Sequence, residues 1–283
     1  QSNGLWDSSR GTTKVLNSDS TSAEGTSSGL TSFDSTGYTM GNFYNQSGNT
    51  YVSWSWRANG GTTSTSHTQG DIDTTIQVNQ DAGFSIVQYQ GDGGSSNFTL
   101  AHGLGAKPAM VFLKDRDTNG NNNQWQAWHQ GLDTNGYFYL STNDAQSTST
   151  NGTVNVSANT TNLIGWQRSS STGGGQTISE SGDNYVMYVW TEIEGFSKFG
   201  KYEGNGNTDG VFCYTGFKPA LVVNKRTDST GHWLVHDNAR DTYNVSKEIL
   251  LWSGSDAEFN SANDRIDFLS NGFKIRSSNT GIN

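Results

Sequence analysis

Short apolar runs alternate with glycine-rich and polar stretches along the chain, and one arrangement of them occurs twice. The first copy begins with GFSIVQY at residue 83 and reaches KPAMVFLK at residue 107. The second begins with GFSKFGKY at residue 195 and reaches KPALVVNK at residue 218, so the offset is 112 at the start (195 − 83) and 111 at the end (218 − 107). The chain's two prolines, Pro108 and Pro219, hold the same place in both copies. We interpret this as an internal repeat of roughly a hundred residues.

Each copy predicts two β-strands joined by a glycine-rich turn. The GFS blocks separate aromatic or apolar residues by polar ones, and the runs after each proline are short and rich in β-formers. A proline has a fixed φ and no N–H, so it suits the first residue of such a strand. No stretch keeps a helical period. The pattern therefore predicts an all-β fold of tandem antiparallel β-sandwich-like repeat units with little or no helix.

The remaining sequence predicts two partial units around a complete one. Residues 1–56 match the region before the C-terminus, at an offset of 230 for Asp7 and Arg10 against Asp237 and Arg240, and of 234 for the KVL run against EIL. YVSWSW at residues 51–56 alternates as a strand with one buried face should, and its copy is YVMYVW at 185–190. A Gly/Thr/Ser-rich linker is expected at 57–70.

We therefore expect a partial unit plus linker at 1–66, a complete unit at 67–194, and a unit without its last strand at 195–283. Either a longer polypeptide was cut, or the N-terminal half-unit completes the C-terminal one. That completion would occur within the chain or between subunits by strand addition.

Composition excludes some classes of partner. Only 31% of the residues are hydrophobic, but 9 Trp, 11 Tyr and 13 Phe can build cores from few side chains. The net charge of −9 disfavours nucleic acid and anionic membranes. No apolar run approaches the length of a membrane span, so we expect no membrane insertion. Cys213 is the only cysteine, so no disulfide within the chain is possible.

The sequence resembles a known but uncharacterised repeat. The series GFSIVQYQGDG, HGLGAKPAMVFLK, YVMYVW, GFSKFGKYEGNG, TGFKPALVVNKRTDSTGHW and SNGFKIR is similar to a repeated domain in structural proteins of marine bacteriophages, notably tail fibres and other virion appendages of cyanophage-like viruses. The resemblance implies a virion component outside the cell that assembles with other virion proteins. Because phage fibres are usually trimers, it also suggests a homotrimer. It implies no catalytic residues and no cofactor.

One acidic turn has some features of a metal site. Asp115, Asp117 and Asn119 copy the first half of an EF-hand loop, but the twelfth position, where a bidentate Glu belongs, is Gln126. The second copy has Arg226 in place of Asp115. A hairpin turn is therefore favoured over a calcium site.

Catalytic constellations are weak. The five histidines show no zinc spacing, and no GxSxG motif singles out a serine. Glu192 and Glu194 could face one way, as paired acids of glycosidases do, but the first copy has Arg57 and Asn59 at the matching places. We expect no enzymatic activity.

Two groups of residues remain as candidates for binding or structure. Asp7 with Arg10, and Asp237 with Arg240, could each tie a loop by a bidentate contact. A second group consists of aromatic residues, and one histidine, that do not recur between copies and could stack on sugar rings: Trp128, His129, Trp166 and Trp252.

The favoured function is a non-enzymatic tail fibre or related virion appendage that presents loops to bacterial surface glycans. Two alternatives stay open. One is a structural capsid-decoration, neck or filament subunit, and the other is a glycan-degrading tailspike.

Overall fold

The computed structural model describes residues 2–59, 65–117, 123–168 and 178–283. In these ranges the regular secondary structure is almost entirely antiparallel β-strand, connected by long loops. The only helical turns there are the short 3-10 segments Asn42–Tyr44 (η1) and Val156–Ala158 (η2). The all-β, sandwich-like fold predicted from the sequence is thus confirmed. None of the helical turns found there is long and apolar enough to cross a bilayer.

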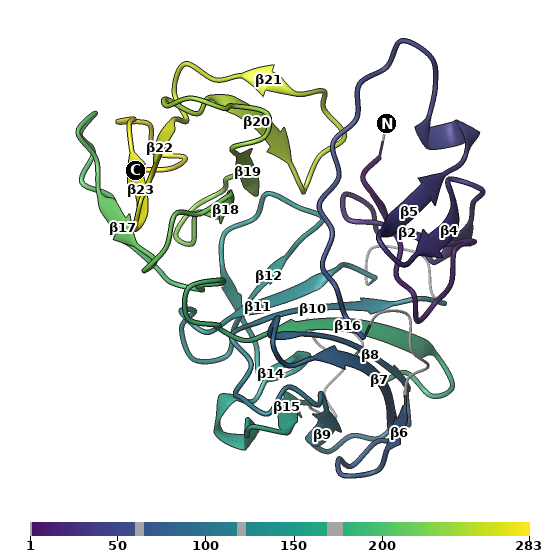
Figure 1. Ribbon diagram of the computed structural model, residues 1–283. Helices are drawn as coiled ribbons and strands as arrows, with labels where there is room; N and C mark the ends of the chain where they lie inside the picture. Colours follow the sequence, from purple (N-terminus) through teal and green to yellow (C-terminus); the bar gives the residue numbers. More distant parts are fainter. Residues whose placement is uncertain (1, 60–64, 118–122, 169–177) are drawn as a thin grey trace.

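The largest sheet has eight strands in the order β13-β12-β11-β10-β16-β8-β7-β6 (Figure 1). Its bounds along that order are Ser147–Thr148, Gly136–Tyr139, Gln126–His129, Met110–Asp115, Asn184–Trp190, Phe84–Gln90, Thr74–Asn79 and Thr65–His67. A three-stranded sheet, β14-β15-β9, packs on one face, with bounds Thr153–Val154, Leu163–Gln167 and Phe98–Ala101. Together they form the M unit. Its edge strand β6 falls inside the predicted linker, of which residues 60–64 lie outside the described residues.

The large sheet is buried on both faces, because its strands feed two cores. Val87 of β8 and Val111 of β10 point into the core shared with the β14-β15-β9 sheet. Phe84 and Phe112 point the other way, into a second core that also takes in Trp233 from the C-terminal part. This explains why β10 and β16 are continuous apolar runs and not alternating ones.

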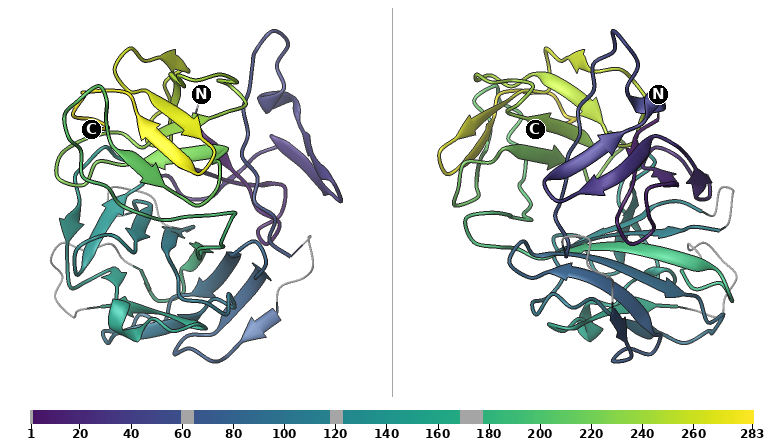
Figure 2. Two further views of the ribbon diagram at one scale, coloured as in Figure 1. Left: turned by 60° about the vertical axis from the view of Figure 1, so that its left-hand side comes forward. Right: turned by 45° about the vertical axis from the view of Figure 1, so that its right-hand side comes forward.

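Two smaller units lie side by side against that second face of the large sheet, as both views of Figure 2 show. The N unit contains β1 to β5, with bounds Gly4–Leu5, Lys14–Asn17, Gly25–Thr26, Leu30–Asp34 and Gly37–Met40. The C unit contains β17 to β23, with bounds Phe212–Tyr214, Leu221–Asn224, Leu234–Asp237, Glu248–Leu251, Phe259–Asn260, Ile266–Leu269 and Gly272–Ile275. Within it, β18-β19-β20-β21 and β17-β23-β22 form two sheets around a third core.

The three units repeat one strand order in one register. β10-β11-β12-β13 of the M unit corresponds to β18-β19-β20-β21 of the C unit, and β11-β12-β13 to β1-β2-β3 of the N unit. The β12–β13 pair Gly136↔Thr148 becomes Glu248↔Asn260 in the C unit, a shift of 112 on both strands. The same C-unit pair becomes Lys14↔Thr26 in the N unit, a shift of 234 on both strands. We infer that the sequence repeat is a repeat of structure.

Two predicted strands are absent from the described residues, because neither segment is hydrogen-bonded along its backbone to a neighbouring strand there. Residues 196–202 of the second GFS block form turns and coil, although their counterparts form β8, and residues 51–57 are extended without being a strand. In the M unit β8 pairs with β16 on one side and with β7 on the other. In the C unit no strand corresponds to β16 or to β7 among the described residues, so the second GFS block has no partner to pair with.

A recurring polar cluster, which we call the clamp, fixes the β1–β2 hairpin of the N unit and the corresponding β19–β20 hairpin of the C unit. In the N clamp, Arg10 Nε donates to Asp7 Oδ2 (2.5 Å), Nη1 to Glu24 Oε2 (3.1 Å) and Nη2 to the Leu5 carbonyl (3.0 Å). The Tyr188 hydroxyl donates to the same Asp7 oxygen (2.6 Å), so β16 of the M unit holds the N unit through this clamp.

The C clamp has the same geometry. Arg240 Nε donates to Asp237 Oδ2 (2.7 Å), Nη1 to Glu258 Oε2 (2.8 Å) and Nη2 to the Val235 carbonyl (2.9 Å). The indole of Trp54 donates to Asp237 Oδ2 (3.3 Å). Trp54 therefore stands where Tyr188 stands in the N clamp, and their positions in YVSWSW and YVMYVW also correspond. The structure thus brings together both predicted Asp–Arg pairs.

Arg116 extends the N clamp to the large sheet. Its Nε and Nη2 donate to the two oxygens of Glu24 (2.8 and 3.0 Å), and its Nη1 donates to Gln88 (3.0 Å). Burial alone would raise the pKa of Glu24, but Arg116 and Arg10 hold this pKa below its ordinary value. The carboxylate therefore stays ionised between two guanidinium groups.

We expect Arg10→Met to lower the free energy of unfolding by about 3–5 kcal/mol, because it leaves the buried Asp7 carboxylate without its cation. Arg226→Met is the matched control. Arg226 pairs with Asp228, whose side chain is 75% exposed, so its loss should leave stability nearly unchanged. Denaturant unfolding of both variants measures the difference, and equal effects would contradict a stabilising role for the clamp.

Candidate functional site

The loop between β19 and β20 is the best candidate site, because it alone departs from its two counterparts. Between the clamp aspartate and the next strand, the N unit has six residues, 8–13, and the M unit has six, 130–135, after His129. The C unit has ten, 238–247. The increase from 230 to 234 in the sequence offset is the trace of this four-residue insertion. We call residues 238–247 the 243 loop.

The two shorter loops are docked on the body of the protein. Ser8 in the N-unit loop donates to Gln77 of β7 (2.7 Å). In the M-unit loop, Gln130 donates to Glu192 (3.0 Å) and to the Phe199 carbonyl (2.7 Å). The longer loop instead leaves Tyr243 85% exposed, the most exposed large apolar side chain among the described residues.

The backbone beneath Tyr243 is fixed by polar contacts. Asp241 Oδ2 accepts the backbone N–H groups of Lys247 and Glu248 (2.6 Å each). Asn244 forms a two-way bond with the backbone of Phe268 in β22, accepting at 2.9 Å and donating at 3.0 Å. The loop borders a hollow of about 530 Å³. An aromatic ring is thus held out from a preorganised loop with polar neighbours, a combination typical of recognition surfaces.

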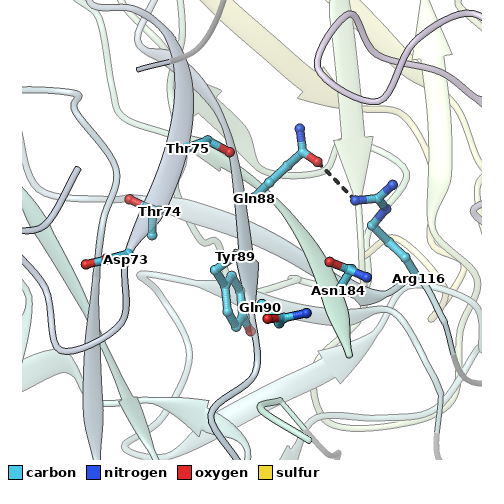
Figure 3. Close-up of a pocket in the computed structure, with 8 residues that line it drawn as sticks. All are labelled: Asp73, Thr74, Thr75, Gln88, Tyr89, Gln90, Arg116 and Asn184. Carbon is cyan, nitrogen blue, oxygen red and sulfur yellow. Dashed lines mark hydrogen bonds between the residues drawn. The ribbon is translucent and has the colours of Figure 1, made fainter. Parts of the chain in front are cut away.

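A second, shallower hollow of about 250 Å³ opens where β7, β8 and β16 end (Figure 3). Its lining consists of Asp73, Thr74, Thr75, Gln88, Tyr89, Gln90, Arg116 and Asn184. Much of this polar lining is already bonded within the protein: Arg116 to Glu24, Asn184 to Asp117, and the Tyr89 hydroxyl to the Ile178 carbonyl (2.6 Å). The hollow offers hydrogen-bonding groups but no exposed aromatic face, so we rank it below the 243 loop.

The predicted sugar-stacking tryptophans are mostly core residues, so that expectation is corrected. Trp128 lies in β11 and is 5% exposed, and Trp166 lies in β15 and is fully buried in the same core. Trp252 follows β20 and packs half-buried against Phe112 (ring centroids 5.9 Å apart) and Trp54. Trp128 and Trp166 fill the core between the two sheets of the M unit, and Trp252 of the C unit packs against the core that the three units share. Lack of recurrence therefore did not indicate a surface position.

His129 has a structural partner instead of a ligand. Its Nδ1 accepts the backbone N–H of Gly131 (2.9 Å), as Asp237 Oδ1 accepts that of Ala239 in the C unit (3.1 Å). Burial lowers the pKa of His129, with a smaller opposing effect from Glu192. A neutral imidazole thus caps the turn that an aspartate caps in the other unit.

The acidic turn after β10 is tied by its own hydrogen bonds. Asp115 Oδ1 accepts the Asp117 N–H (2.8 Å), and Asp117 Oδ2 accepts the backbone and side-chain N–H groups of Asn184 (2.7 Å each). Asn119, the third candidate ligand, lies outside the described residues. Across the part of the chain that is described, no group of three or more His, Cys, Asp or Glu side chains could hold a metal.

Glu192 is held as an anion. Burial would raise its pKa, but Lys198 (2.8 Å), the Phe199 N–H (3.0 Å) and Gln130 keep this pKa below its ordinary value. A glycosidase general acid needs a raised pKa. The bonds of Glu192 therefore suit it poorly as the acid of a pair with Glu194.

Lys114 of β10 is a charged group whose side chain is fully buried. Burial lowers its pKa to about 7, and Nζ donates to the Asn123 carbonyl (2.8 Å). Its counterpart Lys225 likewise donates to backbone carbonyls, of Asp144 (2.6 Å) and Arg226 (2.8 Å), and burial lowers its pKa to about 8. A lysine that recurs in the same bonding role is structural, although perturbed pKa values often mark active sites.

A family model described as a domain of unknown function (DUF7483) matches residues 1–283. The chain belongs to this family. No curated protein matches it, and neither does any solved structure. The site therefore has to be argued from its own geometry.

The buried Lys114 predicts a pH dependence of stability. Its folded pKa of about 7 lies below the unfolded value of about 10.4, so the unfolded chain binds more protons between these values and stability rises with pH across that window. Between about pH 7 and about pH 9, Lys114→Met should reduce the rise in unfolding free energy by up to about 1 kcal/mol per pH unit. Denaturant unfolding at several pH values measures this slope. The exposed Lys218→Met serves as control, and equal slopes in the two variants would contradict the assignment.

Proposed function

We propose that this protein is a non-enzymatic attachment module of a virion appendage, a tail fibre or a related fibre, that binds glycans on a bacterial surface. It would act outside the cell, in company with other virion proteins. The observation that carries the proposal is the 243 loop, because there an otherwise repeated hairpin gains four residues and exposes an aromatic ring. The virion context rests on the sequence resemblance.

The chemistry of the loop favours a neutral, hydroxyl-rich ligand. Tyrosine supplies a flat apolar face and a hydroxyl at low entropic cost. Thr242 and Asn244 flank it, and the lining holds two cations, Arg240 and Lys247. Arg240 is already bonded to Asp237 and Glu258, and the carboxylate of Asp241 lies in the same lining as Lys247. A strongly anionic ligand would need more positive charge than Lys247 alone supplies, whereas a sugar needs a stacking face with polar groups around it.

Binding is favoured over cleavage by the state of the acidic residues. Glu192, one of the two candidate acids, is ionised and bonded to three donors, which supports a structural role. The proposal therefore assigns the protein a display function, in which rigid sheets hold a recognition loop.

The test is binding of the purified protein to an array of bacterial envelope glycans, followed by titration of any bound glycan. Tyr243→Ala should weaken that affinity at least tenfold, because truncation of a central aromatic hot spot typically costs about 2 kcal/mol or more, and about 1.4 kcal/mol is already tenfold. Tyr214→Ala, which removes another exposed tyrosine (67% exposed) from β17, should leave the affinity unchanged. Absence of glycan binding by the unaltered protein, or equal affinities for both variants, would overturn the proposal.

A further inference from the structure

The C unit has an open sheet edge at β18. Its counterpart β10 is flanked by β11 and β16, whereas β18 is paired only with β19 among the described residues. The Ala220 carbonyl accepts the Asn238 N–H on the β19 side. Because backbone groups alternate in direction along an antiparallel strand, those of Leu221 and Val223 face the open side. Such an edge can accept another strand.

Phe196 is an exposed aromatic residue of the C unit whose counterpart is covered by β16 in the M unit. That counterpart, Phe84, is 5% exposed, because Tyr188 and Trp190 of β16 pack on it (ring centroids 6.4 and 5.1 Å away). Phe196 is 58% exposed, although the preceding glycines, Gly83 and Gly195, share positive φ angles of 62° and 75°. The C unit thus carries an apolar ring without the cover that β16 gives its counterpart.

The same chain carries a segment with the sequence of the missing strand. YVSWSW at 51–56 corresponds to YVMYVW of β16 at an offset of 134. It is extended, and no backbone hydrogen bond joins residues 51–57 to any described residue except one from the Asn79 side chain to the Arg57 carbonyl. Tyr51 is 45% and Trp56 39% exposed. Figure 1 shows the segment as the blue trace between the N unit and the C unit.

Within one chain this segment does not complete the C unit. Trp54 meets the C unit at the clamp, through Asp237, and at Trp252. Its counterpart Tyr188 pairs with β10 of its own M unit but reaches the clamp of a different unit, the N unit. Trp54 therefore occupies the position of a neighbour to the C unit, at the clamp and not beside β18.

We propose that the open edge of β18 binds residues 51–57 of a second copy of this chain as an antiparallel strand. The β10–β16 pair Phe112↔Tyr188 sets the register, which becomes Val223↔Trp54 (112 + 111 and 188 − 134). To be donated, the segment leaves its own C clamp, where Trp54 bonds Asp237, and gives up its side-chain contacts with Tyr38 and Trp190. In the acceptor it covers Phe196. Donor and acceptor are different surfaces, so the contact is head-to-tail and either propagates or closes into a ring.

The register predicts which backbone N–H groups the new strand uses. On β16, the Asn184 carbonyl accepts the Arg116 N–H, so the backbone groups of Asn184 point toward β10. Because these groups alternate in direction along the strand, those of Val186 and Tyr188 also point toward β10. Their counterparts Val52 and Trp54 should therefore face β18, and Ser53 should face away. A proline at 52 removes a bonding N–H, whereas a proline at 53 removes one that points to solvent, which an edge strand tolerates.

The first experiment is analytical ultracentrifugation of the 283-residue chain over a range of concentrations. The unaltered protein and Ser53→Pro should associate with dissociation constants within about twofold of each other, and Val52→Pro should weaken association roughly tenfold. A protein that is monomeric at every concentration overturns the proposal, and so do equal effects of the two prolines.

The second experiment locates the contact. The pair Val111↔Val189 predicts that Val222 of one copy lies opposite Ser55 of another. With Cys213 changed to Ser in every chain, a mixture of Ser55→Cys and Val222→Cys proteins should form a disulfide-linked dimer on mild oxidation. A mixture in which Ser53→Cys replaces Ser55→Cys, two residues out of register, should not.

Two outcomes of the second experiment overturn the proposal. One is failure of the in-register mixture to form the linked dimer. The other is formation of the disulfide within one monomeric chain, in a variant that carries both Ser55→Cys and Val222→Cys.

Discussion

The burial of β16 on both faces is the constraint on which the rest of the structure depends. Tyr185, Met187 and Val189 fill the core beneath the small sheet, while Val186 and Tyr188 fill the core shared with the N and C units. The Tyr188 hydroxyl then bonds Asp7 of the N clamp. One strand thus closes the sandwich, joins two cores and positions a neighbouring unit, and each of these effects requires both of its hydrogen-bonding partners, β8 and β10.

The second GFS block shows what happens to a repeated sequence without this strand. Its aromatic pattern and its positive-φ glycine match the first block, yet no strand forms there and Phe196 is exposed. Strand formation depends on pairing with a neighbour and on burial more than on an intrinsic preference of the backbone. The β14-β15-β9 and β17-β23-β22 sheets are retained in both units because their pairing does not involve a β16 counterpart.

Much of the fold could be predicted from the sequence because the repeat constrains it: matching offsets indicated all-β units, and both predicted Asp–Arg salt bridges form. Burial could not be predicted. Trp128 and Trp166 were expected at the surface because they do not recur, but both fill the core between the two sheets of the M unit. The increase in sequence offset from 230 to 234 locates the insertion in the 243 loop. It does not tell whether that loop packs against the rest of the protein or projects into solvent. That outcome depends on contacts between distant elements, such as Asn244 to Phe268, which leave no local pattern in a single sequence.

The two departures from the M-unit pattern act through different elements and can therefore operate together. The 243 loop follows β19, whereas the open edge is on β18 and the donated segment lies at 51–57. Copies joined through the edge would each carry one 243 loop on an identical scaffold. A weak contact of one tyrosine with a sugar would then be multiplied by effective concentration, provided the spacing of the loops suits the glycan. If both proposals hold, self-association and glycan attachment are linked properties: strand addition would set the number and spacing of the loops, and these would determine how tightly a repeating polysaccharide is held.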